Sequence, residues 1–337
     1  MTLGVHCVVF EVGEGAVPES VLERLARDPR IGSAQRMNEF RVLGTDPYRP
    51  LQKSLDLMQI GVTHGDATGR NVRVAVIDTG VDLRHPDLAG QVIRSGDFAP
   101  AATTAFEEDI HGTAVAGVIA ARTGNAEGIA GVAPGARLEV YRACWPDRPS
   151  DTAARCDTLS LARALDTVAR TRPQVLNLSL TGPRDGLIGA LVRAVLDRGV
   201  IIVAAVPEDG GESFIGPFPQ VIRARTGLGD AATEEGADFL APGQDVLTTF
   251  PHGTYNFISG NSFAAANVTG IVALLMEGRP RLSATELRPL LRGSTGHAPP
   301  ASVSGARRGC GSLRPALRQR ACGTPVHGQL ASTTSDF

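Results

Sequence analysis

Three polar residues, each set among small residues, have the side chains that nucleophilic catalysis requires. Asp78 ends the apolar segment VRVAVID, His111 opens HGTAVAGVIAAR, and Ser262 precedes FAAANVTGIVALLMEG. A serine hydroxyl is a poor nucleophile until a base takes its proton. A histidine can be that base, and a carboxylate can fix its tautomer and stabilise the imidazolium. The three residue types therefore predict a catalytic triad, provided that the fold brings them together.

Each residue also has a simpler interpretation. Serine is a preferred helix N-cap, and the segment after Ser262 reads as a helix from about residue 263 to 276. Asp78 alone could bind a ribose or a metal, and His111 alone could cap a helix. The presence of all three, in this order and in these contexts, favours catalysis over three unrelated structural roles.

Composition limits the class of protein. The chain has 337 residues, 42% of them hydrophobic, which is enough for one large domain and a small appendage. A net charge of -2, with scattered charged residues, gives no sign of a nucleic-acid partner. No apolar run approaches the roughly 18 residues of a membrane helix. We expect a monomer without a membrane span.

Two pairs of cysteines bracket short polar segments. Cys144 and Cys156 form one pair, Cys310 and Cys322 the other, and Cys7 is left over on an expected strand. Two local disulfides would fit a secreted or periplasmic protein, whereas five free thiols remain the alternative. The first residues lack a basic-then-apolar signal peptide. Either the sequence begins downstream of its true start or the disulfide interpretation is wrong.

Strands alternate with helices from the segment VRVAVID onward. This alternation predicts an α/β fold, a three-layer doubly wound parallel sheet. Ligands bind at the carboxyl ends of such strands, where Asp78 lies. We expect a small α+β segment at residues 1–50, the main domain at residues 51–293, and a tail rich in Pro, Gly, Ser and Arg at residues 294–337.

Three blocks carry a family resemblance. The segments VAVIDTGVDLRHPDL, HGTAVAGVIA and SGNSFAAANVTG resemble the signature blocks of subtilisin-like serine proteases, in that family's order of Asp, His and Ser. NLSLTGP and DFLAPG resemble further family segments, so that the match extends from about residue 55 to 293. The resemblance implies peptide-bond hydrolysis through an acyl-enzyme, with no cofactor required. Ser262 would attack, His111 would shuttle the proton, and Asp78 would orient His111.

The resemblance also implies where the substrate binds. SLTGP matches the strand that pairs with an extended peptide, and AAV matches the opposite wall of the first specificity pocket. The implied substrate-binding residues are Ser179, Leu180, Thr181, Gly182, Ala204, Ala205 and Val206. Thr181 and Val206 stand where the family usually has glycine, which predicts a narrow pocket and a small or slender residue before the cut.

Two accessory features follow from the same resemblance. Residues 1–50 are similar to the second half of the family's inhibitory propeptide, so that this segment would be a partner removed by self-cleavage between about residues 44 and 54. A fused small domain without processing is the alternative. Asp87 matches a calcium ligand, and Asn125 lies in the loop that usually completes that site, although Asp87 could instead cap a helix or form a salt bridge.

One departure affects the chemistry. The family's asparagine that donates a hydrogen bond to the oxyanion is absent from VIIVAAVPEDGG, where Pro207 falls at the expected position. Proline has no donor. A shift of one or two residues would offer Glu208 or Asp209, and a carboxyl group donates only when protonated. Losing one such donor costs roughly 10²- to 10³-fold in kcat, as measured in a subtilisin.

Two functions therefore remain open. The first is an active, slowed endopeptidase, and the second is a non-catalytic homologue that binds peptide or a partner protein in the cleft. The intact triad favours the enzyme, whereas Pro207 favours the binding protein. An esterase on another α/β fold is disfavoured, because no G-x-S-x-G elbow is present and the triad order differs.

Overall fold

The computed structural model describes residues 18–35, 46–100, 105–148, 151–211, 213–228, 238–279 and 281–295. The chain divides into two compact units, residues 1–43 and 44–337. In the first unit, helix α1 (Pro18–Ala26) confirms the expected helix, and residues 31–35 form no strand. The remainder of the two strands expected in that unit lies outside the described residues. The domain limits at residues 50 and 293 therefore stay predictions.

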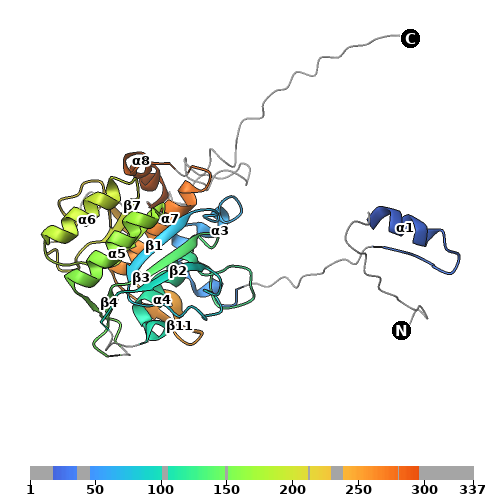
Figure 1. Cartoon of the computed structure of the whole chain (residues 1–337), viewed down its shortest axis with the longest axis horizontal. Coiled ribbons are helices and arrows are strands. Elements are labelled where there is room, and N and C mark those ends of the chain that lie inside the picture. Colours follow the sequence, from blue (N-terminus) through green and yellow to red (C-terminus); the bar gives the residue numbers. More distant parts are fainter. Residues whose placement is uncertain are drawn as a thin grey trace, which may run out of the picture. The chain divides into compact units, whose positions relative to one another are not determined.

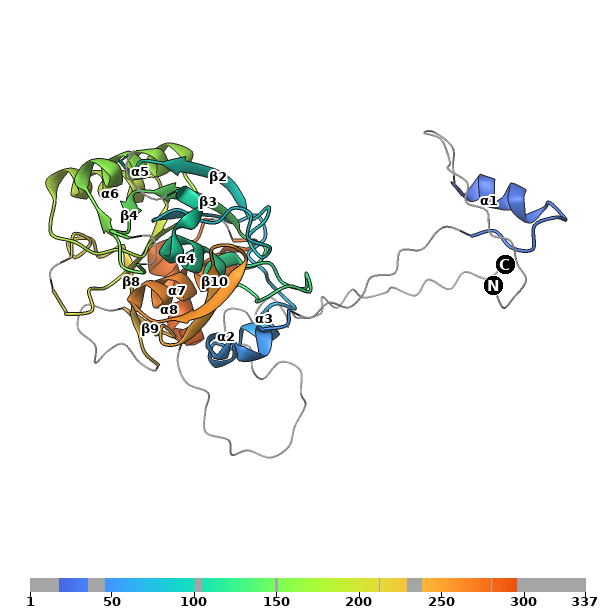
Figure 2. The same cartoon turned by 90° about the horizontal axis from the view of Figure 1, so that it is seen from below.

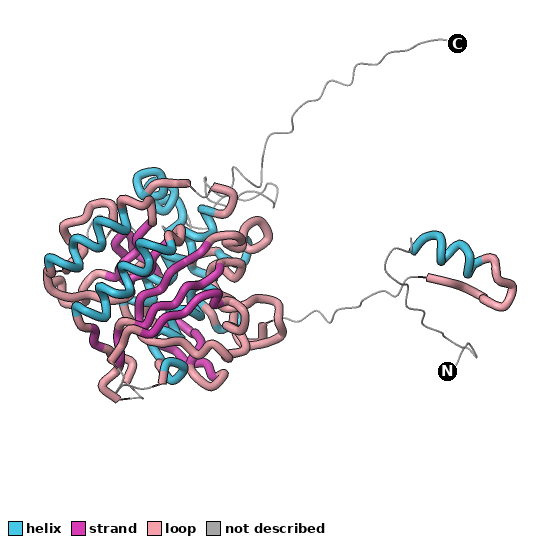
Figure 3. Tube along the Cα trace, in the orientation of Figure 1, coloured by secondary structure: helices cyan, strands magenta, loops and turns pink. Residues whose placement is uncertain are grey.

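A parallel sheet forms the centre of the second unit, as the sequence predicts, and it has seven strands (Figures 1 and 3). Its strands, in spatial order, are β2 (Val92–Asp97), β3 (Arg137–Arg142), β1 (Arg73–Asp78), β6 (Val175–Leu178), β7 (Ile201–Ala205), β8 (Ile222–Thr226) and β9 (Phe239–Ala241). The central strands are buried on both faces, which explains their continuous apolar sequences.

Helices cover both faces of this sheet (Figure 2). One face carries α5 (Thr158–Thr171) and α6 (Gly186–Leu196), which pack around Leu165, Val192 and Ile202. The other carries α4 (Ile110–Ala120), α7 (Asn261–Met276) and α8 (Ala284–Thr295). Helices α4 and α7 are apolar almost all round because both lie in the core. The result is the expected three-layer architecture.

Shorter elements complete the unit. Ahead of β1 lie η1 (Arg49–Leu51), α2 (Lys53–Leu57) and α3 (Ile60–Thr63), and η2 (Phe106–Glu108) precedes α4. Two antiparallel pairs lie outside the main sheet, β4 (Cys144–Trp145) with β5 (Arg155–Cys156), and β10 (Val246–Phe250) with β11 (Thr254–Ile258). None of the helices in the described ranges is long and apolar enough to cross a membrane.

Candidate active site

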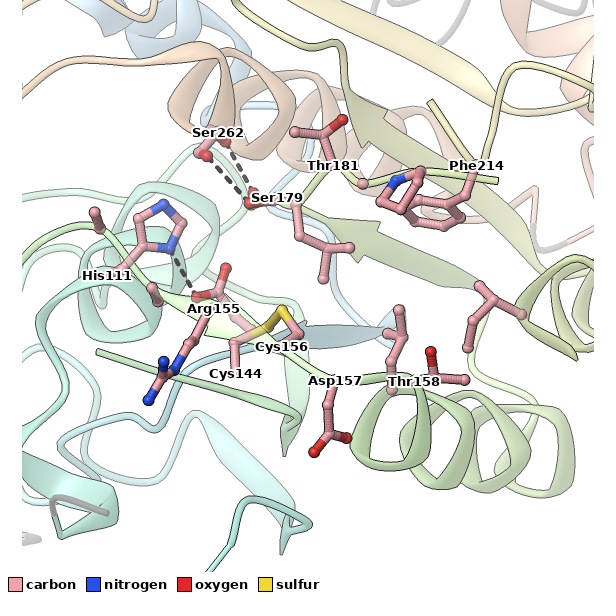
Figure 4. A pocket seen from close by; sticks show the side chains of 18 of the residues that line it. His111, Cys144, Arg155, Cys156, Asp157, Thr158, Ser179, Thr181, Phe214 and Ser262 are labelled. Carbon is pink, nitrogen blue, oxygen red and sulfur yellow. Dashed lines mark hydrogen bonds and ion pairs between the residues drawn. A yellow bond between two sulfur atoms is a disulfide. The ribbon is translucent and has the colours of Figure 1, made fainter. Parts of the chain in front are cut away.

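Three elements bring Asp78, His111 and Ser262 to one cavity of about 720 Å³ (Figure 4). Asp78 ends β1 at the carboxyl edge of the sheet, and His111 lies in the first turn of α4. Ser262 lies in the first turn of α7, whose first N–H groups have no partner inside the helix. Three segments distant in sequence therefore converge where a doubly wound sheet binds ligands.

Asp78 and His111 form a short hydrogen bond. His111 Nδ1 lies 2.7 Å from Asp78 Oδ1, and only 3% of the Asp78 side chain is exposed. Burial acts to lower the pKa of His111, but the charge and the hydrogen bond of Asp78 outweigh it, and the pKa is raised. A proton on Nδ1 is held by Asp78, which leaves Nε2 available as a base.

Ser262 exchanges hydrogen bonds with Ser179 at the end of β6. Ser262 Oγ donates to the Ser179 carbonyl oxygen at 3.1 Å, and Ser179 Oγ donates to the Ser262 carbonyl oxygen at 3.0 Å. In this resting arrangement the serine hydroxyl points to the strand rather than to His111 (Figure 4). Catalytic hydrogen bonds often form only when substrate binds, so the arrangement is compatible with a triad.

A buried polar chain supports this pair, and sequence reasoning missed it. Thr269 Oγ1 donates to Asn177 Oδ1 at 2.8 Å, and Asn177 Nδ2 donates to Ser179 Oγ at 2.8 Å. Asn177 and Thr269 are fully buried. These hydrogen bonds hold the carboxyl end of β6 against α7. The only sign of them in the sequence is one polar residue within each of two apolar segments.

A second support, also missed, lies behind Asp78. Asp109, the residue before α4, accepts a hydrogen bond from Gly80 N at 2.8 Å, and Arg142 Nε lies 2.8 Å from its Oδ2 atom. Asp109 is fully buried, and 2% of the Arg142 side chain is exposed. A Cβ atom on Gly112 would lie 2.5 Å from the Gly80 carbonyl oxygen. The turn after Asp78 and the start of α4 therefore lie so close together that no side chain fits at Gly112.

The predicted substrate-binding residues divide into two groups. Ser179, Leu180, Thr181 and Gly182 line the cavity. Ala204, Ala205 and Val206 are buried at the end of β7, and the cavity lining does not include them or Pro207. Val206 is fixed by Asn261, whose Nδ2 atom donates to the Val206 carbonyl oxygen at 3.0 Å.

The β4–β5 hairpin forms a further wall that the sequence did not predict. Cys144 and Cys156 form a disulfide that joins the two strands, and both residues line the cavity with residues 152–158 (Figure 4). The structure thus confirms one expected disulfide. Cys7, Cys310 and Cys322 lie outside the described residues.

Asp87 and Asn125 lie together, as the calcium interpretation requires, but their polar atoms are already engaged. Asn125 Nδ2 donates to Asp87 Oδ1 at 2.8 Å, and Ile129 N donates to Asp87 Oδ2 at 2.8 Å. Burial and the charge of Asp87 raise the pKa of Tyr255 beside them. Within the described part of the chain, no group of three or more His, Cys, Asp or Glu side chains could hold a metal.

The fold and cavity define a subtilisin-like α/β protein, and comparisons with known proteins agree. The sequence profile of the Subtilase family matches residues 69–221 and 222–312. Subtilisin BL of Lederbergia lenta is 34% identical over 235 residues, which cover 67% of this chain and 83% of that protein. Subtilisin E of Bacillus subtilis strain 168 is 31% identical over 291 residues, which cover 81% of this chain and 72% of that protein.

A solved structure gives the same result. Fervidolysin from Fervidobacterium pennivorans, a keratinolytic enzyme related to subtilisin, aligns with a TM-score of 0.61 and 27% identity, over 77% of this chain and 44% of that chain. The chain belongs to the subtilase family and is a serine endopeptidase.

Proposed function

We propose that the chain hydrolyses peptide bonds through an acyl-enzyme, with Ser262 as nucleophile, His111 as base and Asp78 as the residue that orients His111. The observation that carries this proposal is the 2.7 Å hydrogen bond between Asp78 and His111 in the cavity that Ser262 also lines. Family membership supports the reaction type.

The steps follow from the roles of the three side chains. Ser262 Oγ forms a bond to the substrate carbonyl carbon, its proton passes to His111 Nε2, and the carbonyl oxygen takes the negative charge. Collapse breaks the C–N bond, and the same proton leaves with the amine. A water molecule then attacks the carbonyl carbon of the ester in the same way, with His111 as the base, and Ser262 is released. Before the first step Ser262 must turn from the Ser179 carbonyl oxygen towards His111.

The substrate in this proposal is an extended polypeptide that pairs with residues 179–182. Main-chain pairing would recognise many sequences, and side-chain pockets would select among them. Thr181 lines the cavity together with Ser262 and carries a side chain where the family usually has glycine, which supports a preference for a small residue before the cut. Val206 as part of the opposite wall stays a prediction.

Several further expectations accompany this proposal. Residues 1–50 would act as a propeptide, and the mature protein would be a secreted or periplasmic monomer. The Cys144–Cys156 disulfide supports an oxidising compartment. A calcium ion at Asp87 does not fit the present arrangement, because N–H groups point at the two carboxylate oxygens that a cation would need.

A second candidate function rests on one observation. Because the Ser262 hydroxyl donates to Ser179 rather than to His111, the cleft could hold a peptide without cleaving it. Cleavage of an unfolded polypeptide by the wild-type protein and not by Ser262→Ala supports the enzyme. Binding of the same polypeptide by both proteins without cleavage supports the second candidate.

A further inference from the structure

Glu208 lies beside Gly260, the residue that precedes α7 and stands two positions before Ser262 in the sequence. Its Oε1 atom is 3.4 Å from the position that a Cβ atom on Gly260 would occupy. Gly260 is the N-cap of α7, with φ of 149°, and Ser262 follows in the first turn. Glu208 itself is exposed to solvent, whereas Pro207 is buried.

Three hydrogen bonds explain why Glu208 lies at this position. Asn261, the first residue of α7, donates from Nδ2 to the Val206 carbonyl oxygen at 3.0 Å and accepts from Thr226 N at 2.9 Å. The chain after β7 is thus held against the start of α7. On the other side, Arg225 Nη2 donates to the main-chain carbonyl oxygen of Glu208 at 3.3 Å.

This position matters for the reaction because negative charge develops next to Ser262. The substrate carbonyl oxygen becomes an oxyanion when Ser262 Oγ attacks, and first-turn N–H groups of α7 point at such a charge. A donor side chain across from the helix would add to this stabilisation. A carboxylate has no N–H or O–H group to donate, so it accepts hydrogen bonds only and repels an oxyanion.

We propose that Glu208, and not Pro207, is the side chain that faces the oxyanion, and that its carboxylate slows acylation. The inference rests on the proposed Ser262 mechanism. Replacing the carboxylate with an amide of the same shape exchanges a repelling oxygen for an N–H donor. Acylation therefore becomes faster in Glu208→Gln, whereas most substitutions beside an active site slow the reaction.

The test compares Glu208→Gln with wild type, and Asp209→Asn is the matched control. Asp209 is the adjacent exposed carboxylate, and its Oδ1 atom accepts from Gly211 N, a contact that asparagine retains. The measurement is the single-turnover acylation rate with a chromogenic peptide ester and a peptide amide at neutral pH. Removing a donor of this kind costs roughly 10²- to 10³-fold. We therefore expect Glu208→Gln to accelerate acylation by about 10²-fold, and Asp209→Asn by less than about threefold because exposed charges are screened.

The outcomes separate this inference from the function on which it rests. Acceleration by Glu208→Gln alone supports the inference. An unchanged or slower rate in folded Glu208→Gln, or an equal rise in both variants, overturns it while Ser262-dependent turnover still supports the enzyme. If no variant shows acylation that Ser262→Ala abolishes, the proposed mechanism fails and the inference fails with it.

Discussion

His111 Nδ1 and Asp78 Oδ1 lie 2.7 Å apart, at the junction of α4 and the end of β1. The charge and hydrogen bond of Asp78 overcome the effect of burial and raise the pKa of His111. Because a catalytic base works only when neutral, a raised pKa moves the loss of activity on the acid side to higher pH.

The pH profile of kcat/KM tests this relationship. We expect its acid limb in the wild-type protein above pH of about 6.5, the ordinary histidine value. Asp78→Asn removes both influences that raise the pKa, so the limb should shift to lower pH while kcat falls by roughly 10⁴-fold. If the acid limb of the kcat/KM profile lies at the same pH in Asp78→Asn as in wild type, a group other than His111 controls it.

The disulfide of the β4–β5 hairpin gives a second prediction. Cys144 and Cys156 are 12 residues apart, and their hairpin walls the cavity. Cross-linking a loop of this size stabilises a fold by about 3 kcal/mol. In the double variant Cys144→Ser/Cys156→Ser we expect a lower melting temperature and a higher KM for peptides, with kcat little changed. Reducing agent should lower the melting temperature and raise KM in wild type, and it should leave the KM of the double variant unchanged. A change of KM in both proteins would contradict the assignment of these effects to the Cys144–Cys156 disulfide.

The buried pair of Arg142 and Asp109 gives a third prediction. Removing one partner leaves a buried charge, which costs about 3 to 5 kcal/mol. We expect Arg142→Met to lower the free energy of unfolding in urea by this amount. Arg170→Met, which removes an exposed pair with Asp166 on α5, should change it by less than about 0.5 kcal/mol. Similar losses in the two variants would contradict a structural role for Arg142.

Thr181 gives a fourth prediction, on specificity. In a peptide panel that varies the residue before the cut, wild type should favour Ala over Phe in kcat/KM. Thr181→Gly removes a side chain from the cavity lining and should raise cleavage after Phe by about 10-fold, a change of about 1.4 kcal/mol in barrier. Thr158→Ala, farther along the same cavity, is the control. Equal cleavage after Phe and Ala by wild type would refute the narrow pocket.

The sequence predicted the elements whose patterns are strong. β1, β6 and β7 are mostly apolar, and α4 and α7 are apolar helices with His111 and Ser262 in their first turns, so their types were clear. β2 was missed because this edge strand is half exposed, with no apolar alternation in VIRSGD. β10 and β11 were missed because they pair outside the sheet.

Within the site, the sequence predicted only those residues whose own type and position in the chain indicate a role. The proposed triad was predicted from residue type and chain order. The support of Asp109 by Arg142 depends on contacts between distant segments, which a single sequence does not record. Which side chain after β7 faces the oxyanion stays a prediction for a related reason. The sequence could not decide between Pro207 and Glu208, because the geometry depends on how Asn261 holds Val206.

The central claim is that Ser262 is a nucleophile activated by His111, and one measurement tests it most directly. The folded protein is treated with a fluorophosphonate, and the modified residue is mapped by mass spectrometry in wild type, His111→Ala and Ser262→Ala. We predict a stable adduct on Ser262 in wild type, much slower labelling in His111→Ala, and none in Ser262→Ala. No adduct on Ser262 in folded wild-type protein, or equal labelling of wild type and Ser262→Ala, would contradict the account.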